Sequence, residues 1–344
     1  PAVQWLTLNE FHPVALATPL LLFALWYLDE DRLVLFAAFA VAAWLCKEEI
    51  PLVVGAFGAW YAVTRRRWLP GTVIAVAGVA GSAIAIGIII PHFNEGASSA
   101  FYGRYDEVGG SPGGILRTAV TDPGELLGVA FDERGVRYLA ALVLPLALLC
   151  LASPLALVAA PELALNLLSA TPTQTSIRFH YTAGAIPALV GASVFGAAML
   201  ERWKRGLAFP MAVLAAGAAL IGNYRLGPLP VWRELPGGQS DQAYASHVSA
   251  HDRAAARAVA LVPDDAVVSA TNSLGAHLSA RRRVLSFPYV QDAEWVLADE
   301  TRPGYGDRVA PLPLATRLAR LRRNPAWHLV FAEDAVLVFR RADG

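Results

Sequence analysis

An uncharged run of 20 residues, positions 71–90, constrains the fold more than any other feature of the sequence. A helix rises about 1.5 Å per residue, so this run is long enough to cross the roughly 30 Å hydrocarbon core of a bilayer. The whole chain of 344 residues is 56% hydrophobic and 16% charged, whereas ordinary soluble domains are about 25% charged. These observations exclude a single soluble globule and indicate a membrane protein.

The charged residues are unevenly distributed along the chain. Residues 1–222 contain 28 of them, and the 122 residues of 223–344 contain the same number. We therefore predict a transmembrane helical domain over 1–222, a linker over 223–240 and a soluble domain over 241–344. The formal net charge is zero, which argues against nucleic acid as a partner, because a nucleic-acid binder carries a basic surface.

The first domain contains about eight hydrophobic segments, each bordered by charged residues or proline. Only the fourth segment reaches about 20 residues, so the number of membrane crossings stays open. The segments are 13–28, 33–46, 50–63, 71–90, 138–151, 154–168, 183–200 and 207–222.

Two basic clusters predict the orientation of these segments, because Lys and Arg concentrate in short cytoplasmic loops. The clusters are Arg65 to Arg67 and Arg202 to Arg205. If both are cytoplasmic, the other face of the membrane holds the chain start, the 47–49 turn, the 91–137 loop, the 169–182 stretch and everything after 222. The 91–137 loop is either a plain spacer or a set of juxtamembrane helices that lie in the interface. We expect a plasma-membrane location with an extracytoplasmic C-terminal domain.

The C-terminal domain has the alternating pattern of a small α/β domain. We predict helices over 247–261, 273–279 and 312–323, and strands over 266–270, 284–287 and 295–298. The segments 328–332 and 336–340 form a predicted hairpin around Glu333-Asp334. The lone Gly275 lacks the spacing of a dinucleotide-binding loop.

Ionisable residues inside or beside apolar segments are functional candidates, because burying a charge in a bilayer costs several kcal/mol. Lys47-Glu48-Glu49 interrupts a long apolar run. Either these three side chains form a self-neutralised ion-pair knot, or Lys47 holds a phosphate while a carboxylate takes a proton or binds a cation. Glu10 and His12 precede the first segment, where they either cap a helix or project into a site at the membrane edge.

Two further groups of polar residues lie near the sixth and seventh segments. Glu162 and Asn166 are four residues apart, so they share one face of a helix. Arg178 offers a fork for a phosphate, His180 can carry a proton or bind a metal, and Tyr181 follows it. The nucleophile elbow and the P-loop pattern are both missing from the sequence, so hydrolase and ATPase functions lack support.

Five sequence strings that include these polar residues together resemble the bacterial multi-pass membrane family called domain of unknown function 2079, along essentially the whole chain. They are Glu10-Phe-His-Pro-Val-Ala-Leu-Ala, Lys47-Glu-Glu, Pro161-Glu-Leu-Ala-Leu-Asn-Leu-Leu-Ser, Ser176-Ile-Arg-Phe-His-Tyr and the segment from Val262 to Ser279. That family in turn resembles the C-type (GT-C) superfamily of membrane glycosyltransferases. This second resemblance implies a polyprenyl-phosphate sugar donor and an active site that faces outward.

The sequence departs from that superfamily at its start. Those enzymes usually carry an acidic motif in the first outer loop, and this chain begins at Pro1, already close to the first apolar segment, without an initiator Met. We therefore expect an N-terminal piece, with a possible catalytic base, to precede these residues. Glu10 stands where the family pattern suggests Asp, and it keeps the acid.

The resulting hypothesis is a GT-C-like enzyme that transfers a sugar from a polyprenyl phosphate to an envelope acceptor at the outer face. Lys47, Arg178, His180 and Tyr181 would hold the lipid phosphate, and Glu10, His12, Glu48 and Glu49 would do acid–base work or position the acceptor. Glu162 and Asn166 would support the site, and a divalent cation is a candidate cofactor. A transporter or flippase and a non-enzymatic envelope scaffold are the alternatives.

Overall fold

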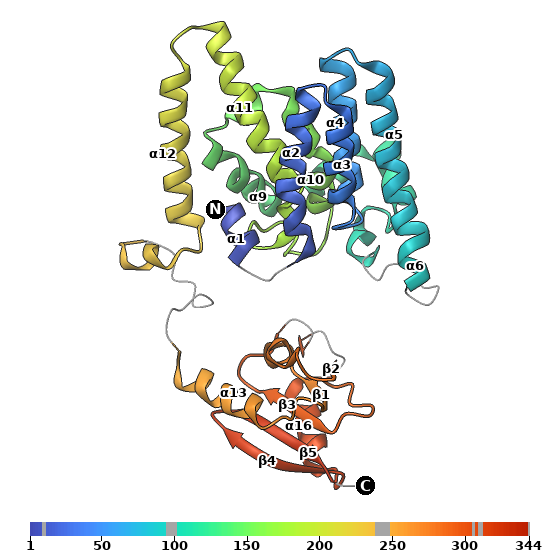
Figure 1. Cartoon of the computed structure of the whole chain (residues 1–344), viewed down its shortest axis with the longest axis vertical. Coiled ribbons are helices and arrows are strands. Elements are labelled where there is room, and N and C mark those ends of the chain that lie inside the picture. Colours follow the sequence, from blue (N-terminus) through green and yellow to red (C-terminus); the bar gives the residue numbers. More distant parts are fainter. Residues whose placement is uncertain (9–11, 94–101, 238–247, 305–306, 309–311, 343–344) are drawn as a thin grey trace. The chain divides into compact units, whose positions relative to one another are not determined.

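The computed structural model describes residues 1–8, 12–93, 102–237, 248–304, 307–308 and 312–342. The chain divides into two compact units, Pro1–Tyr244 and Ala245–Gly344. The first unit is helical and the second contains a five-stranded sheet (Figure 1).

The described part of the first half of the helical unit is a series of helices. They are α1 (Ala2–Leu8), α2 (Ala17–Asp29), α3 (Leu33–Trp44), α4 (Ile50–Thr64), α5 (Trp68–Ile84) and α6 (Ile90–Phe93). A π-helical segment, Ala85–Ile89, joins α5 to α6 without a break. Pro13 opens a 3₁₀ turn before α2, at a position where its missing N–H costs nothing.

Glycines allow α4 and α5 to pack closely. Gly55 and Gly58 on α4 face Gly71 and Gly78 on α5, and a Cβ placed on Gly78 would lie 2.4 Å from the carbonyl oxygen of Pro51. Small residues at such interfaces let two helix backbones approach, as they do in membrane helix pairs. The packing fixes the start of α4, and with it the turn that contains Lys47.

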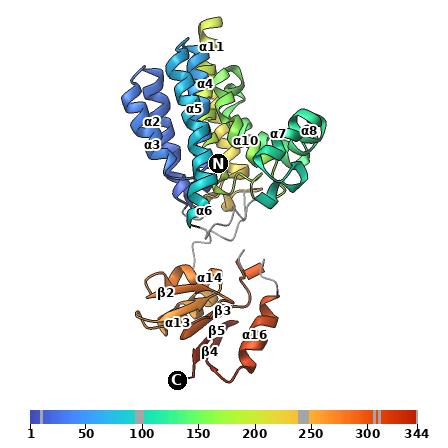
Figure 2. The ribbon, with the colours of Figure 1, turned by 90° about the vertical axis from the view of Figure 1, so that its right-hand side faces the viewer.

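The second half of the helical unit mixes α-helices with 3₁₀ turns. Its helices are α7 (Pro112–Thr121), α8 (Pro123–Ala130), α9 (Glu133–Val143), α10 (Ala160–Leu167), α11 (Ala185–Trp203) and α12 (Ala208–Leu226). Ser111, Asp122 and Asp132 cap the N-termini of α7, α8 and α9 with their side chains. The 91–137 loop therefore contains short capped helices over its described part (Figure 2).

Eight membrane spans are not supported. Among the described residues, three helices are long and apolar enough to cross a bilayer, namely Trp68–Phe93, Ala185–Trp203 and Ala208–Leu226. The 138–151 stretch is not one helix, because α9 ends at Val143 and Pro145 cannot continue the hydrogen-bond ladder. Ala147 and Leu148 then adopt left-handed backbone angles, which interrupt the helical path between two 3₁₀ segments. The shorter apolar helices are Pro13–Asp29, Leu33–Trp44, Ile50–Thr64 and Pro154–Leu167.

The helical unit has two chemically different ends. The connections from α4 to α5 and from α11 to α12, which carry the two basic clusters, lie at the same end (Figure 1). There, Arg65 pairs with Asp29, and Arg67 pairs with Asp31, at the turn between α2 and α3. The Lys47 turn lies at the other end of α4, about 22 Å away for a helix of 15 residues.

The second unit is built on a mixed sheet with strand order β2-β1-β3-β5-β4. The strands are β1 (Val267–Ala270), β2 (Arg283–Ser286), β3 (Trp295–Asp299), β4 (Trp327–Glu333) and β5 (Val336–Arg341). Strand β1 runs parallel to β2 and β3, and β5 runs antiparallel to β3 and β4. The predicted strands and hairpin are therefore confirmed within one or two residues.

Helices cover both faces of this sheet. They are α13 (Ala250–Ala260), the short α14 (Asn272–Gly275) and α16 (Leu314–Arg323). Neighbouring residues of β1 point to opposite faces, so Val268 joins the core that includes Ala258 of α13, and Val267 joins the core that includes Leu318 of α16. The C-terminal α/β domain thus has two small hydrophobic cores of its own.

Candidate functional site

The Lys47 turn joins α3 to α4 and is held against α5. Ser82 Oγ of α5 donates a hydrogen bond of 2.7 Å to the carbonyl oxygen of Glu48. Lys47 Nζ lies 2.5 Å from Glu49 Oε1, and their side chains are only 22% and 15% exposed. Lys47 and Glu49 therefore form an ion pair, which is part of the three-residue knot that was one of the two alternatives. The Glu48 carboxylate has neither a hydrogen bond nor an ion pair among the described residues.

Tyr181 brings the loop before α11 to this turn. Lys47 Nζ lies 4.9 Å from the centre of the Tyr181 ring, within the range of a cation–π interaction. Asn166 Nδ2 of α10 donates to the carbonyl oxygen of Tyr181 at 2.6 Å and to the hydroxyl of Tyr138 at 2.9 Å. The buried Asn166 is thus a positioning residue for Tyr181.

The two predicted histidines stack on each other. The ring centres of His12 and His180 are 3.7 Å apart, and the His180 ring lies 4.2 Å from that of Tyr181. Burial, followed by the nearby charge of Lys47, lowers the pKa of His180 to about 3. His180 is therefore neutral at physiological pH and offers one ring nitrogen as a donor and one as an acceptor.

Glu162 is buried beneath the same loop. Its Oε1 accepts a hydrogen bond of 3.1 Å from the backbone N–H of Gly184, and its Oε2 has no partner in the described part of the chain. A Cβ at Gly184 would lie 2.0 Å from Glu162 Oε2. A buried carboxylate oxygen without a partner is costly, so Glu162 is a strong candidate for a functional group rather than a stabilising one.

Arg104 was not among the predicted site residues, and it contributes a second cation from the 3₁₀ segment Tyr102–Val108. Its guanidinium lies 5.8 Å from the centre of the Tyr181 ring, and Nη1 lies 3.4 Å from both the Tyr181 hydroxyl and Gln174 Oε1. The backbone N–H of Ala170 donates to the Arg104 carbonyl oxygen at 2.7 Å. The only sequence signal was an arginine between two tyrosines in the long polar loop.

The contact described for Arg178 lies outside this cluster. Arg178 lies with its guanidinium 5.2 Å from the centre of the Trp5 ring, and Trp5 Nε1 donates to the carbonyl oxygen of Leu226. Glu10 lies outside the described residues, so its predicted role is untested. The described cluster therefore consists of Lys47, Glu49, Tyr181, His12, His180, Asn166 and Arg104, with Glu48 and Glu162 adjacent to Lys47.

A divalent cation has no evident ligand set here. Among the described residues, no group of three or more His, Cys, Asp or Glu side chains is placed to hold a metal ion. The carboxylate of Glu49 in this cluster is already paired with Lys47.

A family model described as "Predicted membrane protein (DUF2079)" matches residues 1–337. The chain belongs to this family. The match covers both the helical unit and most of the sheet unit, so DUF2079 membership extends over the turn at Lys47, the loop at Tyr181 and the C-terminal domain. No curated protein and no solved structure matches the chain.

Membership in DUF2079 confirms a membrane protein, and the lipid bilayer is accordingly a partner of the chain. The apolar surface of the long helices agrees with this conclusion, because Leu69, Val76 and Val213 are all largely exposed. Exposed apolar side chains along a 26-residue helix fit contact with lipid rather than with water.

Proposed function

We propose that this protein is a membrane glycosyltransferase that takes its sugar from a polyprenyl-phosphate donor. The observation that carries the proposal is the position of two cations, Lys47 and Arg104, over the one ring of Tyr181. Lys47 and Arg104, beside the neutral His180, form a site where a phosphate can pair with one cation on each side. A long apolar tail on the same ligand suits a site at the end of a lipid-facing helical bundle.

The reaction is a substitution at the anomeric carbon of the donor sugar. The acceptor hydroxyl forms a new bond to that carbon while the bond from the carbon to the phosphate oxygen breaks. The bonding electrons leave with the polyprenyl phosphate, and the added negative charge is stabilised by Lys47 and Arg104. The acceptor proton passes to a general base.

Glu48 is the better of the two neighbouring carboxylates for the role of base. Glu49 is engaged by Lys47 at 2.5 Å, whereas Glu48 has no such partner among the described residues. Glu48 is half-buried and adjacent to Lys47, which keeps it close to the leaving phosphate. A free, partly shielded carboxylate can accept a proton from an attacking hydroxyl.

The proposed site lies on the extracytoplasmic side. The Lys47 turn is at the opposite end of α4 from Arg65, Arg66 and Arg67, which the distribution of Lys and Arg in membrane proteins assigns to the cytoplasm. This placement supports an envelope acceptor and an extracytoplasmic C-terminal domain in a plasma-membrane protein.

Binding and transfer are tested separately on the full chain in lipid nanodiscs. Binding compares decaprenyl monophosphate with decaprenol, and transfer uses decaprenyl-phosphate glucose, mannose and arabinose that are radiolabelled in the sugar. Lys47→Ala and Arg104→Ala should lose binding of the phosphate, and Glu48→Gln should bind normally but lose transfer. Arg117→Ala removes an exposed arginine from α7 and should behave as wild type.

Three results would contradict the proposal. Equal binding of decaprenyl monophosphate and decaprenol would show that the cations do not recognise phosphate. Phosphate-dependent binding without transfer from any of the three donors would favour the transporter or flippase alternative. If the cluster residues tolerate substitution in both assays, the scaffold alternative becomes the better account.

A further inference from the structure

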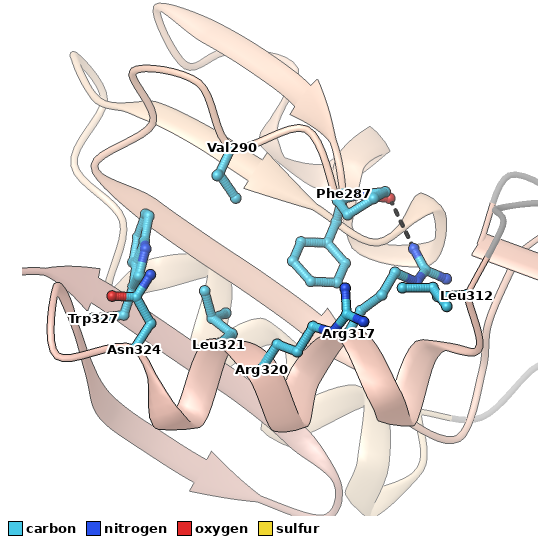
Figure 3. Close-up of a pocket in the computed structure, with 9 residues that line it drawn as sticks. Phe287, Val290, Leu312, Arg317, Arg320, Leu321, Asn324 and Trp327 are labelled. Atoms are coloured by element: carbon cyan, nitrogen blue, oxygen red, sulfur yellow. Dashed lines mark hydrogen bonds between the residues drawn. The ribbon is translucent and has the colours of Figure 1, made fainter.

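A cavity of about 360 Å³ lies in the second unit, between α16 and the chain that follows β2. Figure 3 shows Val290, Leu321 and Trp327 around it, with Phe287 facing them. This volume is within the range of small-molecule sites, whose walls are mostly apolar with a few polar groups. Nothing in the proposed transfer mechanism uses this cavity.

Arg317 at the edge of the cavity is a buried cation without an acidic partner among the residues that the structure describes. It is 6% exposed, and its guanidinium donates to the backbone carbonyl oxygens of Phe287 and Asp307. Its Nε has no partner in the described residues. The Asp307 carboxylate is occupied elsewhere, because it accepts hydrogen bonds from the backbone N–H groups of Asn272 and Gly304.

Arg320 adds a second guanidinium one turn further along α16. It lines the cavity, is exposed, and has neither an ion pair nor a hydrogen bond among the described residues. Figure 3 shows the side chains of Arg317 and Arg320 both running toward Phe287. Helix α16 holds four arginines and no acidic residue, so the mouth of the cavity favours an anion.

The other side of the cavity is apolar. Phe287, Val290, Leu321 and Trp327 form this part, and Asn324 supplies an amide at the rim. The Trp327 ring also contacts Arg341, whose guanidinium lies 5.2 Å from the ring centre. A ligand that satisfies both sides has an apolar body and an anionic head.

We infer that this cavity binds a single-chain anionic amphiphile. Its phosphate or carboxylate lies between Arg320 and the edge of Arg317, and its first few carbon atoms lie between Phe287 and Trp327. An anion at this position supplies the counter-charge that the buried Arg317 lacks. The inference does not depend on the transfer reaction at Lys47, because the two sets of residues belong to separate units.

The test uses the full chain in nanodiscs of neutral lipid and a photoreactive geranyl monophosphate, with crosslinked peptides identified by mass spectrometry. Peptide mapping separates this cavity from the Lys47 cluster. Unlabelled geranyl monophosphate, decanoate, geraniol and inorganic phosphate compete in parallel. If geranyl monophosphate blocks the crosslink more strongly than decanoate does, the natural ligand is a prenyl phosphate. If decanoate blocks it more strongly, the natural ligand is a fatty acid.

We expect crosslinks within residues 287–290 and 312–327, and competition by an anionic amphiphile but not by geraniol or inorganic phosphate. Arg320→Ala should weaken binding at this cavity about tenfold or more. Arg323→Ala, which removes an exposed arginine of the same helix outside the cavity, should change it less than twofold. Val290→Phe, which fills part of the apolar side, should also block the crosslink.

Three results would overturn the inference. Equal competition by geraniol would remove the anion requirement. Equal weakening by Arg320→Ala and Arg323→Ala would point to general attraction of an anionic surface to α16. Crosslinks confined to the helical unit would show that the cavity does not take this class of ligand.

Discussion

The ammonium group of Lys47 lies 4.9 Å from the centre of the Tyr181 ring, although 134 positions separate the two residues. This contact joins the turn before α4 to the loop before α11. Arg104 reaches the same ring from the long polar loop. Tyr181 is therefore the residue on which the two proposed phosphate-binding cations converge.

Replacing Tyr181 tests that convergence. Tyr181→Phe keeps the ring beside Lys47 but removes the hydroxyl that lies 3.4 Å from Arg104 Nη1, whereas Tyr181→Leu removes both interactions. A cation–π interaction contributes about 0.5–2 kcal/mol. Affinity for decaprenyl monophosphate should fall slightly in the Phe variant and several-fold further in the Leu variant. Identical affinities in the two variants would show that the ring does not hold the cations.

Asn166 should be sensitive to loss of its amide. Its Nδ2 donates to the Tyr181 carbonyl oxygen, and Asn166→Asp would replace that donor with a carboxylate that repels it. An unsatisfied buried group costs about 1–3 kcal/mol. The thermal unfolding temperature should fall clearly in Asn166→Asp. The matched variant Tyr138→Phe removes only one acceptor of the same amide, so its unfolding temperature should fall less. A larger fall in Tyr138→Phe than in Asn166→Asp would contradict the role of Asn166 in positioning Tyr181.

Close packing of α4 against α5 makes Gly78 hard to replace. A Cβ at this position would lie 2.4 Å from the Pro51 carbonyl oxygen and 2.5 Å from Gly55 Cα, so backbone must move. We expect Gly78→Ala to destabilise the fold by about 1–3 kcal/mol. Gly217→Ala on α12, where a Cβ meets nothing within 4 Å, is the control. Thermal unfolding in nanodiscs measures both, and an equal response would contradict the packing argument.

The C-terminal unit should lose stability at alkaline pH. His251 Nε2 lies 2.8 Å from Asp299 Oδ2, and Nδ1 lies 3.1 Å from Asp334 Oδ2, an arrangement that only the protonated ring satisfies at both nitrogens. The hydrogen bond to Asp299 raises the pKa of His251 above its usual 6.5. Because the folded pKa is the higher one, this stabilisation is complete below pH 6.5 and is lost as the pH rises through the folded pKa.

Unfolding of the second unit, followed by the fluorescence of Trp295 and Trp327, should therefore be less favourable at pH 6 than at pH 9. His251→Gln should flatten this dependence between the two pH values, and Asp334→Asn should reduce it. A full pH dependence in His251→Gln would assign the effect to other groups.

Local sequence patterns predicted the second unit well and the helical unit only in part. Short, mostly apolar runs mark β1 and β3, and the structure buries nearly every residue of both strands. Polar and ionisable side chains beside apolar segments could be recognised in the sequence, because burying them near lipid costs free energy. They are Lys47, Glu49, His12, His180, Tyr181 and Asn166.

The remainder depends on contacts between distant segments. Arg104 looked like an ordinary loop residue, because its 3.4 Å approach to Gln174 requires the loop to fold back over 70 positions. The left-handed residues Ala147 and Leu148, which interrupt the helical path, lie inside an uninterrupted apolar run of the sequence. The contact of Arg178 with Trp5 likewise joins α1 to the loop before α11, a relation that hydropathy alone does not contain.

The most direct test of the proposed site is a cryo-electron microscopy structure of the full chain in nanodiscs with decaprenyl monophosphate. We expect the phosphate within about 4 Å of both Lys47 Nζ and an Arg104 guanidinium nitrogen, with the Lys47–Glu49 pair loosened by the new anion. Density for the lipid phosphate elsewhere, with Lys47 still paired to Glu49 and both cations still over Tyr181, would contradict the assignment of this cluster as the donor site.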